Sequence, residues 1–319
     1  MIMNDILKKI KSSSKLGITF HTSPDGDALG SSMALVLGLR KLGKDCYIIS
    51  KDSIPEVYKY LPLVDEVNSI NTKVIENTDC VIVLDCGNPG RISADLEPIS
   101  RKYTLINIDH HLSNDLYGDI NFVDTNASAM GEIVYQMLRL LGIAIDIPMA
   151  ECLYTSIVTD TGGFRYSNTT SVTHTIIGDL INLGIDFSRI HRDIFENKKF
   201  SRLKLYSKVI DQMYLDYSGE ICIMKLTHKM LSDLDLQASD TSDIVSIGME
   251  IESVEVGILI KEVEAGVKLS LRSKNYVNVR EIAERFGGGG HIRAAGLSLN
   301  TSIEDAERII LEVLKNELI

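Results

Sequence analysis

The feature that most constrains this chain is a series of short apolar runs, each followed closely by a histidine or an aspartate. The runs, with the polar residue that follows each, are 17–20 with His21, 81–84 with Asp85, and 103–108 with Asp109. Runs of this length, rich in β-branched residues, are typical of buried strands. The segment 28–39 has small and apolar residues at helical spacing. Strands that alternate with helices predict an α/β fold with a doubly wound parallel sheet.

The polar residues at the ends of these runs are expected to lie together. In an open α/β sheet, ligands bind outside the carboxyl ends of the strands. The triplet Asp109-His110-His111 places a carboxylate beside two imidazoles at such an end. This combination suggests a metal ligand, a group that orients it and a proton donor. Taken alone, the triplet is equally compatible with a solvated loop.

The second half of the chain has a different pattern of apolar and charged residues, which predicts a second domain. We expect a metal-binding domain over 1–187, a charged helical linker over 188–214, and a smaller α/β domain over 215–319. The linker prediction rests on the density of Lys and Arg between Arg189 and Lys204. The last domain is expected to contain strands at 221–226, 253–261 and 267–272, and helices at 277–286 and 303–318.

Charge and composition exclude several classes of function. The chain has 319 residues and a net charge of −11, which disfavours tight binding of long nucleic acid because such binding depends on neutralising phosphates. Small phosphorylated substrates remain compatible with this charge. The five cysteines form no Cys-x-x-Cys pair, which predicts buried free thiols in a reducing compartment. No apolar run is long enough to span a bilayer, and no signal peptide is evident, so a cytoplasmic location is expected.

A metal site is the main chemical prediction. His21, Asp25 and Asp27 can turn toward one point, and this mixture of ligands suits a borderline-hard divalent ion such as Mn²⁺. The alternative is a simple Pro-Asp-Gly turn. The six candidate metal ligands are His21, Asp25, Asp27, Asp85, His110 and Asp160. Two imidazoles and four carboxylates suffice for two ions if one carboxylate bridges them, which is the arrangement used in phosphoryl chemistry.

These motifs, in this order, resemble the four motifs of the DHH phosphoesterase superfamily. The segment Gly287-Gly288-Gly289-Gly290-His291 resembles that of the DHHA1 domain, which accompanies the DHH domain in one branch. The resemblance covers nearly the whole chain, and the two-domain length looks like the NrnA type. That type comprises oligoribonucleases and 3′-phosphoadenosine-5′-phosphate phosphatases. It implies an active site in a cleft between the two domains.

The resemblance also implies a role for each residue of the first domain. His21 and Asp25 would hold one Mn²⁺, with Mg²⁺ or Co²⁺ as possible substitutes. Asp27, His110 and Asp160 would hold the second ion, and Asp85 would bridge the two. His111 would stabilise or protonate the leaving oxygen, and Asp109 would orient a histidine.

The glycine-rich segment of the second domain predicts a phosphate site. Gly288, Gly289 and Gly290 let the backbone approach a ligand closely, and His291 follows them directly. The alternative is a flexible hinge. Arg272 and Ser273, at the end of a predicted strand, resemble the substrate-phosphate contact of this branch, and an arginine can bind a phosphate through two hydrogen bonds. The alternative for Arg272 is a solvated charge.

The expected function is metal-dependent hydrolysis of very short oligonucleotides to 5′-mononucleotides, and of 3′-phosphoadenosine-5′-phosphate to AMP. One alternative is a phosphodiesterase dedicated to linear dinucleotides such as pApA or pGpG. The other is a nucleotide-binding regulator without activity. The expected partners are therefore short oligonucleotides and bisphosphate nucleotides, without long duplexes or membranes. A homodimer is compatible with the sequence, which does not rank RNA against DNA or give the cleavage polarity.

Overall fold

The computed structural model of the protein describes residues 2–96, 101–236 and 241–318. The chain divides into two compact units, residues 1–197 and 198–319, and each is described by itself. The predicted linker over 188–214 spans this division. Helix α6 (Phe187–Phe195) belongs to the first unit and helix α7 (Phe200–Ile210) to the second.

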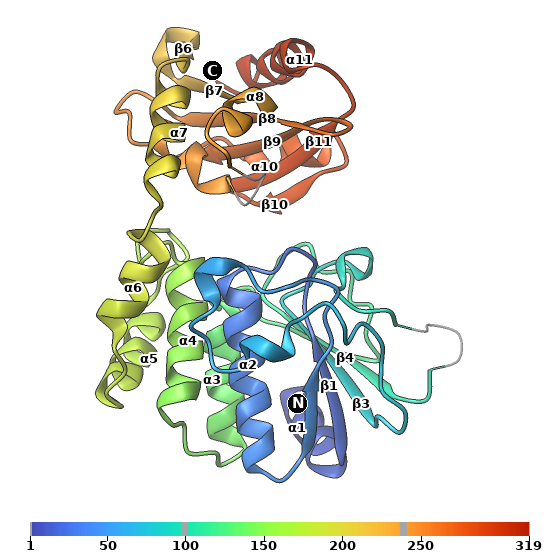
Figure 1. The fold of residues 1–319 in the computed structure, drawn as a ribbon. Coiled ribbons are helices and arrows are strands. Elements are labelled where there is room, and N and C mark those ends of the chain that lie inside the picture. Colours follow the sequence, from blue (N-terminus) through green and yellow to red (C-terminus); the bar gives the residue numbers. More distant parts are fainter. Residues whose placement is uncertain (1, 97–100, 237–240, 319) are drawn as a thin grey trace. The chain divides into compact units, whose positions relative to one another are not determined.

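The first unit is built on a parallel sheet of five strands (Figure 1). The strands are β1 (Lys15–Thr19), β2 (Asp45–Ile48), β3 (Cys80–Leu84), β4 (Thr104–Asp109) and β5 (Ile120–Val123). Their order is β2-β1-β3-β4-β5, and every pairing is parallel. The order reverses between β1 and β3, as in a doubly wound fold. The crevice at such a reversal is where ligands bind in folds of this kind.

Helices cover one face of this sheet in Figure 1. Besides α6, the helices of the unit are α1 (Ile2–Ser12), α2 (Gly26–Lys41), α3 (Met130–Leu140), α4 (Ile147–Asp160) and α5 (Ser171–Asn182). The segment from Met130 to Asp160 forms two of these helices, α3 and α4. Pro148 lies in the first turn of α4, where its missing N–H costs nothing, and Asp146 caps that turn.

Strand β3 explains why the apolar runs are continuous instead of alternating. Ile82 and Leu84 pack into the core shared with the helices, while Val81 and Val83 pack into a second apolar cluster on the opposite face. Among the described residues, that second face is covered by irregular connections that contribute Ile92, Ala94 and Tyr103. The unit also has short 3₁₀ turns at Glu56–Tyr58, Val64–Glu66 and Pro89–Arg91, and the first two contribute Tyr58 and Val64 to the core on the helical face. A strand buried on both faces is expected to be apolar throughout.

Helix α2 occupies the centre of the helical layer and is buried on almost every side. Small residues allow α4 to approach it closely. A Cβ atom at Gly30 would lie 2.4 Å from the carbonyl oxygen of Cys152, so no other residue fits there without a shift of the helices. The amino-terminal end of α2 and the carboxyl-terminal end of α4 carry predicted metal ligands, and this close packing fixes their spacing.

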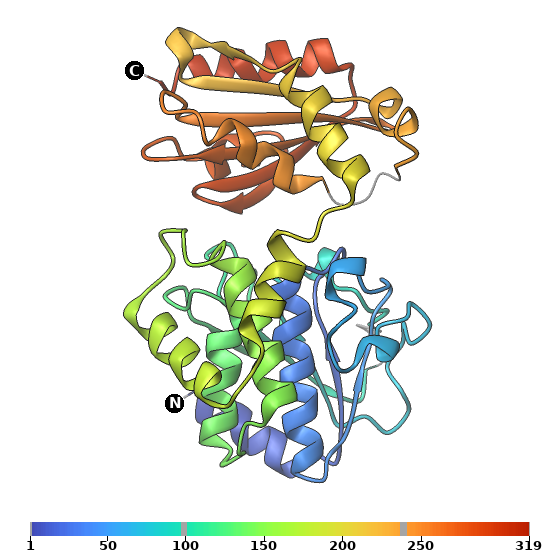
Figure 2. The same ribbon diagram turned by 60° about the vertical axis from the view of Figure 1, so that its left-hand side comes forward.

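The second unit is a six-stranded mixed sheet with helices on both faces (Figure 2). The strands are β6 (Tyr214–Asp216), β7 (Ile221–Leu226), β8 (Val256–Val263), β9 (Gly266–Ser273), β10 (Gly289–His291) and β11 (Ala294–Leu299). Their order is β10-β11-β9-β8-β7-β6, with only the β7–β8 pairing parallel.

The helices of the second unit divide between two apolar clusters. Helices α10 (Val279–Glu284) and α11 (Ile303–Lys315) pack on one face of the sheet. Helices α7, α8 (His228–Ser232) and α9 (Val245–Gly248) pack on the other, together with 3₁₀ turn Ser242–Ile244. A further 3₁₀ turn, Tyr217–Gly219, connects β6 to β7. The α/β character predicted for both halves of the chain is confirmed.

Two further sequence predictions concern cysteines and membranes. All five cysteines are buried free thiols, as predicted. Across the described parts of the chain, no helix combines the length and the apolar character that crossing a bilayer requires.

Candidate active site

The predicted site residues of the first unit lie at the carboxyl edge of its sheet. Strands β1, β3 and β4 are neighbours, and His21, Asp85 and Asp109 lie at or just past their carboxyl ends. Asp85 has a left-handed backbone conformation with φ of 55°. Aspartate tolerates this conformation better than most residues, and such strained positions are enriched at functional sites.

Helices bring the remaining ligand candidates to the same edge. Asp25 caps the amino-terminal end of α2, where its Oδ1 accepts hydrogen bonds from the N–H groups of Asp27 and Ala28. Asp27 lies in the first turn of that helix and is buried. Asp160 is the last residue of α4. The Pro-Asp-Gly segment is therefore a helix cap, and the cap positions both carboxylates.

The six predicted ligands gather into two groups that could each hold a metal ion. One group is His21, Asp25 and Asp85, and the other is Asp27, His110 and Asp160. Within each group the ligand atoms lie within 4.8 Å of one another. A third grouping, of Asp85, Asp109, His110 and His111, overlaps the second through His110.

Asp85 contacts both groups through different oxygens. Its Oδ2 lies 3.5 Å from Nε2 of His21, and its Oδ1 lies 3.5 Å from Nε2 of His110. The carboxylate therefore lies between the two groups with one oxygen directed to each. This is the placement that a bridging ligand requires.

Backbone carbonyls orient the two histidine candidates. Nδ1 of His21 lies 2.9 Å from the carbonyl oxygen of Thr22, and Nδ1 of His110 lies 3.2 Å from that of Ala127. A carbonyl only accepts, so Nδ1 carries the proton in both rings. This leaves Nε2 directed toward the carboxylates in each case. Histidines that bind metals are usually oriented by a hydrogen bond of this kind.

The carboxylates of the cluster stabilise positive charge on the groups beside them. Burial would lower the pKa of His21, but its contacts with Asp25 and Asp85 raise that pKa to about 11. The pKa of His110 is likewise raised against the effect of burial, by Asp85 first and then by Asp160 and Asp27. Burial raises the pKa of Asp160 to about 7, with His110 opposing the shift and Asp85 adding to it. Divalent cations would be stabilised in the same way, and their binding displaces protons from such ligands.

Two buried oxygen atoms provide an independent test of whether these residues fit a metal. Oδ1 of Asp85 and Oδ2 of Asp160 have no hydrogen-bond partner within the described residues. Buried polar atoms without such partners are rare in proteins and call for an explanation, such as an ion. The mixture of imidazole and carboxylate ligands fits Mn²⁺, Mg²⁺ or a similar cation better than a thiolate-preferring metal. The residues present therefore fit the implied metals.

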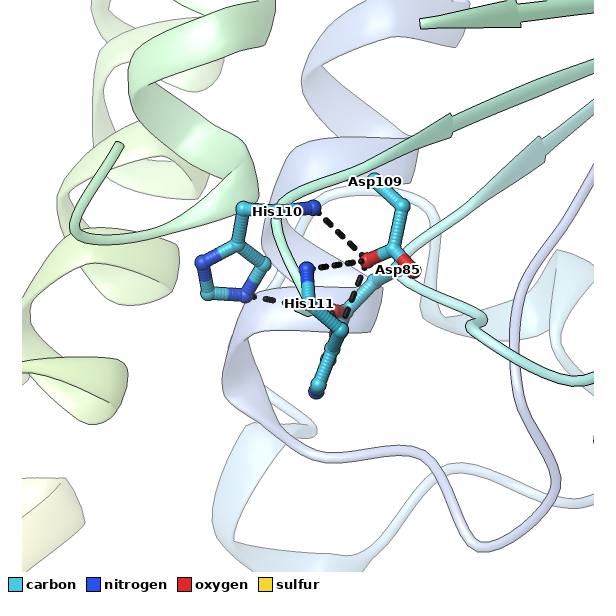
Figure 3. A group of neighbouring side chains, drawn as sticks. All are labelled: Asp85, Asp109, His110 and His111. Atoms are coloured by element: carbon cyan, nitrogen blue, oxygen red, sulfur yellow. Dashed lines mark hydrogen bonds and ion pairs between the residues drawn. The ribbon is translucent and has the colours of Figure 1, made fainter. Parts of the chain in front are cut away.

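Asp109 differs from the other carboxylates because its oxygens are already engaged (Figure 3). Its Oδ1 accepts from the N–H groups of His110 and His111 and lies 2.7 Å from Nδ1 of His111. Its Oδ2 accepts from the side-chain amide of Asn114 at 2.6 Å. Fully buried, it holds the loop and the His111 ring in place. Burial opposes the shift, but Asp109 raises the pKa of His111 above its usual value.

The predicted substrate residues of the second unit come together across three adjacent strands. His291 of β10 pairs with Ala294 of β11, which in turn pairs with Arg272 of β9. Directly paired residues project to the same face of a sheet, so His291 and Arg272 share one face with a small alanine between them. Their α-carbons are about two strand spacings apart, roughly 10 Å.

The glycine-rich segment is a turn followed by a strand, and its glycines serve different purposes. Gly287 lies three residues beyond the end of α10, and its φ is 74°. A Cβ at Gly288 would lie 2.3 Å from the carbonyl oxygen of Gly296, and one at Gly290 would lie 2.4 Å from that of Ala294. Gly289 is exposed, and a Cβ there would meet no atom within 4 Å. The fold of the described residues thus accounts for every glycine of the segment except Gly289.

Several polar groups near Arg272 hold a loop. The hydroxyl of Ser273 donates to the carbonyl oxygen of Val277 at 2.7 Å, and the Arg293 guanidinium donates to the same oxygen at 2.8 Å. The buried carboxylate of Glu255 accepts from the backbone N–H groups of Asn275, Tyr276 and Val277. No local sequence pattern indicates this role of Glu255, because its partners lie about twenty residues away.

Comparisons with known proteins show the family to which the chain belongs. The model of the DHH family N-terminal domain matches residues 15–157, and that of the DHHA1 domain matches residues 220–318. A Streptococcus mutans protein named a probable bifunctional oligoribonuclease and PAP phosphatase NrnA is 32% identical, over 98% of each chain. A Thermus thermophilus protein named a bifunctional oligoribonuclease and PAP phosphatase NrnA is 29% identical, over 99% of this chain and 94% of its own.

A solved structure shares the fold of both units. An exopolyphosphatase-related protein from Bacteroides fragilis superposes with a TM-score of 0.90 at 27% identity, over 99% of this chain and 96% of that one. The family models match both halves of the chain, and the relatives are similar over their full length. The chain therefore belongs to the DHH family and carries a DHHA1 domain in its second half.

Proposed function

We propose that this protein is a phosphoesterase that uses two divalent metal ions to hydrolyse very short oligonucleotides and 3′-phosphoadenosine-5′-phosphate. Membership of the DHH family makes the chain a hydrolase. Relatives of similar length carry names that specify oligoribonuclease and PAP phosphatase activity. The products would be 5′-mononucleotides from the oligonucleotides, and AMP with phosphate from the bisphosphate nucleotide.

The position of Asp85 is the observation that carries the proposal. Each of its oxygens lies 3.5 Å from a histidine of a different ligand group. The carboxylate thus supports an assignment in which His21 and Asp25 bind one ion and Asp27, His110 and Asp160 bind the other. When bound, the pair of ions would offset charge on the phosphate and make water a better nucleophile.

His111 would supply a proton to the leaving oxygen, and Asp109 would orient the His111 ring. We assign to His111 the role of stabilising or protonating the leaving oxygen. Asp109 holds Nδ1 of His111, so a proton donated to substrate would come from Nε2, on the opposite side of the ring (Figure 3). The raised pKa of His111 favours the protonated form that this role needs.

The second unit would recognise the part of the substrate that does not react. We assign phosphate binding to Arg272 and His291, which share one face of the sheet. The backbone of Gly288, Gly289 and Gly290 would approach the same phosphate, and Ser273 would fix the strand end through its bond to Val277. This group of residues would bind one phosphate or nucleotide. A small site of this kind agrees with very short substrates and with the net charge of −11, which disfavours long nucleic acid.

We propose Mn²⁺ as the physiological metal, with Mg²⁺ and Co²⁺ as substitutes. The donor set of two imidazoles and four carboxylates supports this choice, since imidazole favours Mn²⁺ over Mg²⁺. Stripping the protein of metal and adding back single cations would rank them. Activity with Zn²⁺ alone would contradict this choice of metal.

A substrate-length series tests the function. RNA and DNA oligonucleotides of two to about ten residues would be hydrolysed beside 3′-phosphoadenosine-5′-phosphate, with Mn²⁺ present. The proposal expects kcat/KM to be highest for dinucleotides or trinucleotides and to fall with length, and expects the bisphosphate to be hydrolysed. Turnover of pApA and pGpG alone would instead support a dedicated linear-dinucleotide phosphodiesterase. Absence of turnover with every substrate would support a regulator.

A further inference from the structure

Asp27 is held by more donors than any simple cap would provide. Its Oδ2 accepts from the backbone N–H of Met130 at 2.8 Å, and its Oδ1 accepts from that of Gly131 at 3.3 Å. The hydroxyl of Ser156 donates to the same Oδ1. All four residues are buried, so water does not compete for these bonds.

The carboxylate also completes a helix that lacks its own cap. Ala129, at the amino-terminal end of α3, offers no side-chain oxygen, and Asp27 from α2 takes that place. The two N–H groups that it satisfies would otherwise be unpaired in the core. The positive end of the α3 dipole adds a favourable interaction with the carboxylate.

Two glycines make room for Ser156. A Cβ at Gly131 would lie 2.3 Å from its hydroxyl oxygen, and a Cβ at Gly30 would lie 2.9 Å from its backbone nitrogen. Helices α2, α3 and α4 therefore meet around this serine without intervening side chains. The close packing brings its hydroxyl to the carboxylate, although the two residues are 129 positions apart.

A count of acceptor sites shows what this arrangement does. A carboxylate has about two acceptor positions on each oxygen. Ser156 and Gly131 occupy both positions on Oδ1, whereas Met130 occupies only one on Oδ2. The remaining position is on the oxygen that lies 3.5 Å from Nε2 of His110. Asp27 is thus prepared to bind a cation through Oδ2 alone.

We infer that Ser156 is a positioning residue that holds Asp27 in this orientation and thereby sets the affinity of the Asp27–His110–Asp160 group for its cation. The inference rests on the proposed two-metal site. Residues that orient metal ligands typically contribute about 10- to 100-fold to metal affinity. Within the described residues, Ser156 forms no hydrogen bond with His21, Asp25 or Asp85, so that group serves as an internal reference.

The chain offers a matched control for a serine substitution. Ser31 is also fully buried, and it lies one helical turn from Asp27. Its hydroxyl donates to the backbone carbonyl of Asp27 at 2.7 Å and not to the carboxylate. Ser31→Ala therefore removes a buried hydroxyl bonded to the same residue, but leaves the carboxylate bonds intact.

Calorimetric titration of metal-stripped protein with Mn²⁺ tests the inference without an activity readout. Wild type is expected to bind two ions. Ser156→Ala is expected to bind one of them about 10-fold or more weakly and the other unchanged, whereas Ser31→Ala keeps both affinities within about twofold. Ser156→Cys is the second variant, for use if Ser156→Ala folds poorly. It keeps a side chain of similar size but replaces the hydroxyl with a weak hydrogen-bond donor, and it is expected to show the same loss of affinity.

Two results would overturn the inference. One is wild-type affinity for both ions in Ser156→Ala and Ser156→Cys. The other is an equal loss in Ser31→Ala, which would indicate general damage to helix packing. Failure of the wild type to bind Mn²⁺ is a different outcome, and it would count against the two-metal site itself.

Discussion

Nδ1 of His111 lies 2.7 Å from Oδ1 of Asp109, a carboxylate that is fully buried and holds the surrounding loop. This pair separates two adjacent histidines by role. His110 directs Nε2 toward Asp27, Asp85 and Asp160. His111 instead directs Nδ1 to Asp109, a carboxylate outside the proposed ligand set, and the same nitrogen lies 3.5 Å from Oδ1 of Asp85.

Replacing His111 is therefore expected to slow hydrolysis without preventing metal binding. His111→Ala should lower kcat by about 10²- to 10⁴-fold, the usual contribution of a general acid, while two Mn²⁺ still bind in calorimetry. Asp109→Asn should also lower kcat, because a neutral amide stabilises the protonated His111 ring less than the carboxylate does. Loss of both metals from His111→Ala would show that this histidine is a ligand.

Asp85 is expected to be the most sensitive of the metal ligands. Asparagine tolerates its left-handed backbone, so Asp85→Asn tests the carboxylate with little added strain. We expect weakened binding at both metal positions and a loss of kcat/KM beyond about 100-fold, since even residues that only orient ligands contribute that much. Asp25→Asn, at the exposed side of one group, is the comparison. Similar losses in the two variants would contradict the bridging assignment.

Gly289 offers a test of substrate binding that spares the fold. Because a Cβ at this position meets no neighbouring atom, Gly289→Ala should leave the melting temperature unchanged and raise KM for a dinucleotide. Gly288→Ala should instead lower the melting temperature, since its Cβ would lie 2.3 Å from a carbonyl oxygen. An unchanged KM in Gly289→Ala would remove this glycine from the proposed phosphate site.

Arg272 and Arg293 of the second unit are expected to behave differently. Arg272→Ala should raise KM by roughly tenfold, because its proposed partner is the substrate phosphate. Arg293→Ala should mainly lower stability, by about 1–2 kcal/mol, because it loses hydrogen bonds to the carbonyl oxygens of Asn275 and Val277. Urea denaturation and steady-state kinetics on both variants check the distinction. A larger KM effect in Arg293→Ala would reverse the assignment.

The sequence predicted the edge of the first sheet well, for a physical reason. Parallel strands place their carboxyl ends together, so polar residues that follow buried runs must meet if the strands are neighbours. His21, Asp85 and Asp109 meet this condition because β1, β3 and β4 are adjacent. The catalytic and ligand roles of these residues remain predictions that the experiments above address.

The sequence could not predict how the carboxylates are held. The bond between Ser156 and Asp27 depends on the packing of three helices around Gly30 and Gly131, which leaves no local pattern. The loop contacts of Glu255 and Arg293 have the same character, since they link segments through tertiary structure. The position of the active site in a cleft between the domains also remains a prediction.

The most direct test of metal-dependent hydrolysis is the cleavage of a labelled dinucleotide by metal-stripped protein with Mn²⁺ added back. The wild type is expected to convert the dinucleotide to 5′-mononucleotides only after Mn²⁺ is added. The rate is expected to be at least about 100-fold lower for His111→Ala with both ions bound. If the wild type hydrolyses neither the dinucleotide nor 3′-phosphoadenosine-5′-phosphate with Mn²⁺, Mg²⁺ or Co²⁺, the proposed function is wrong.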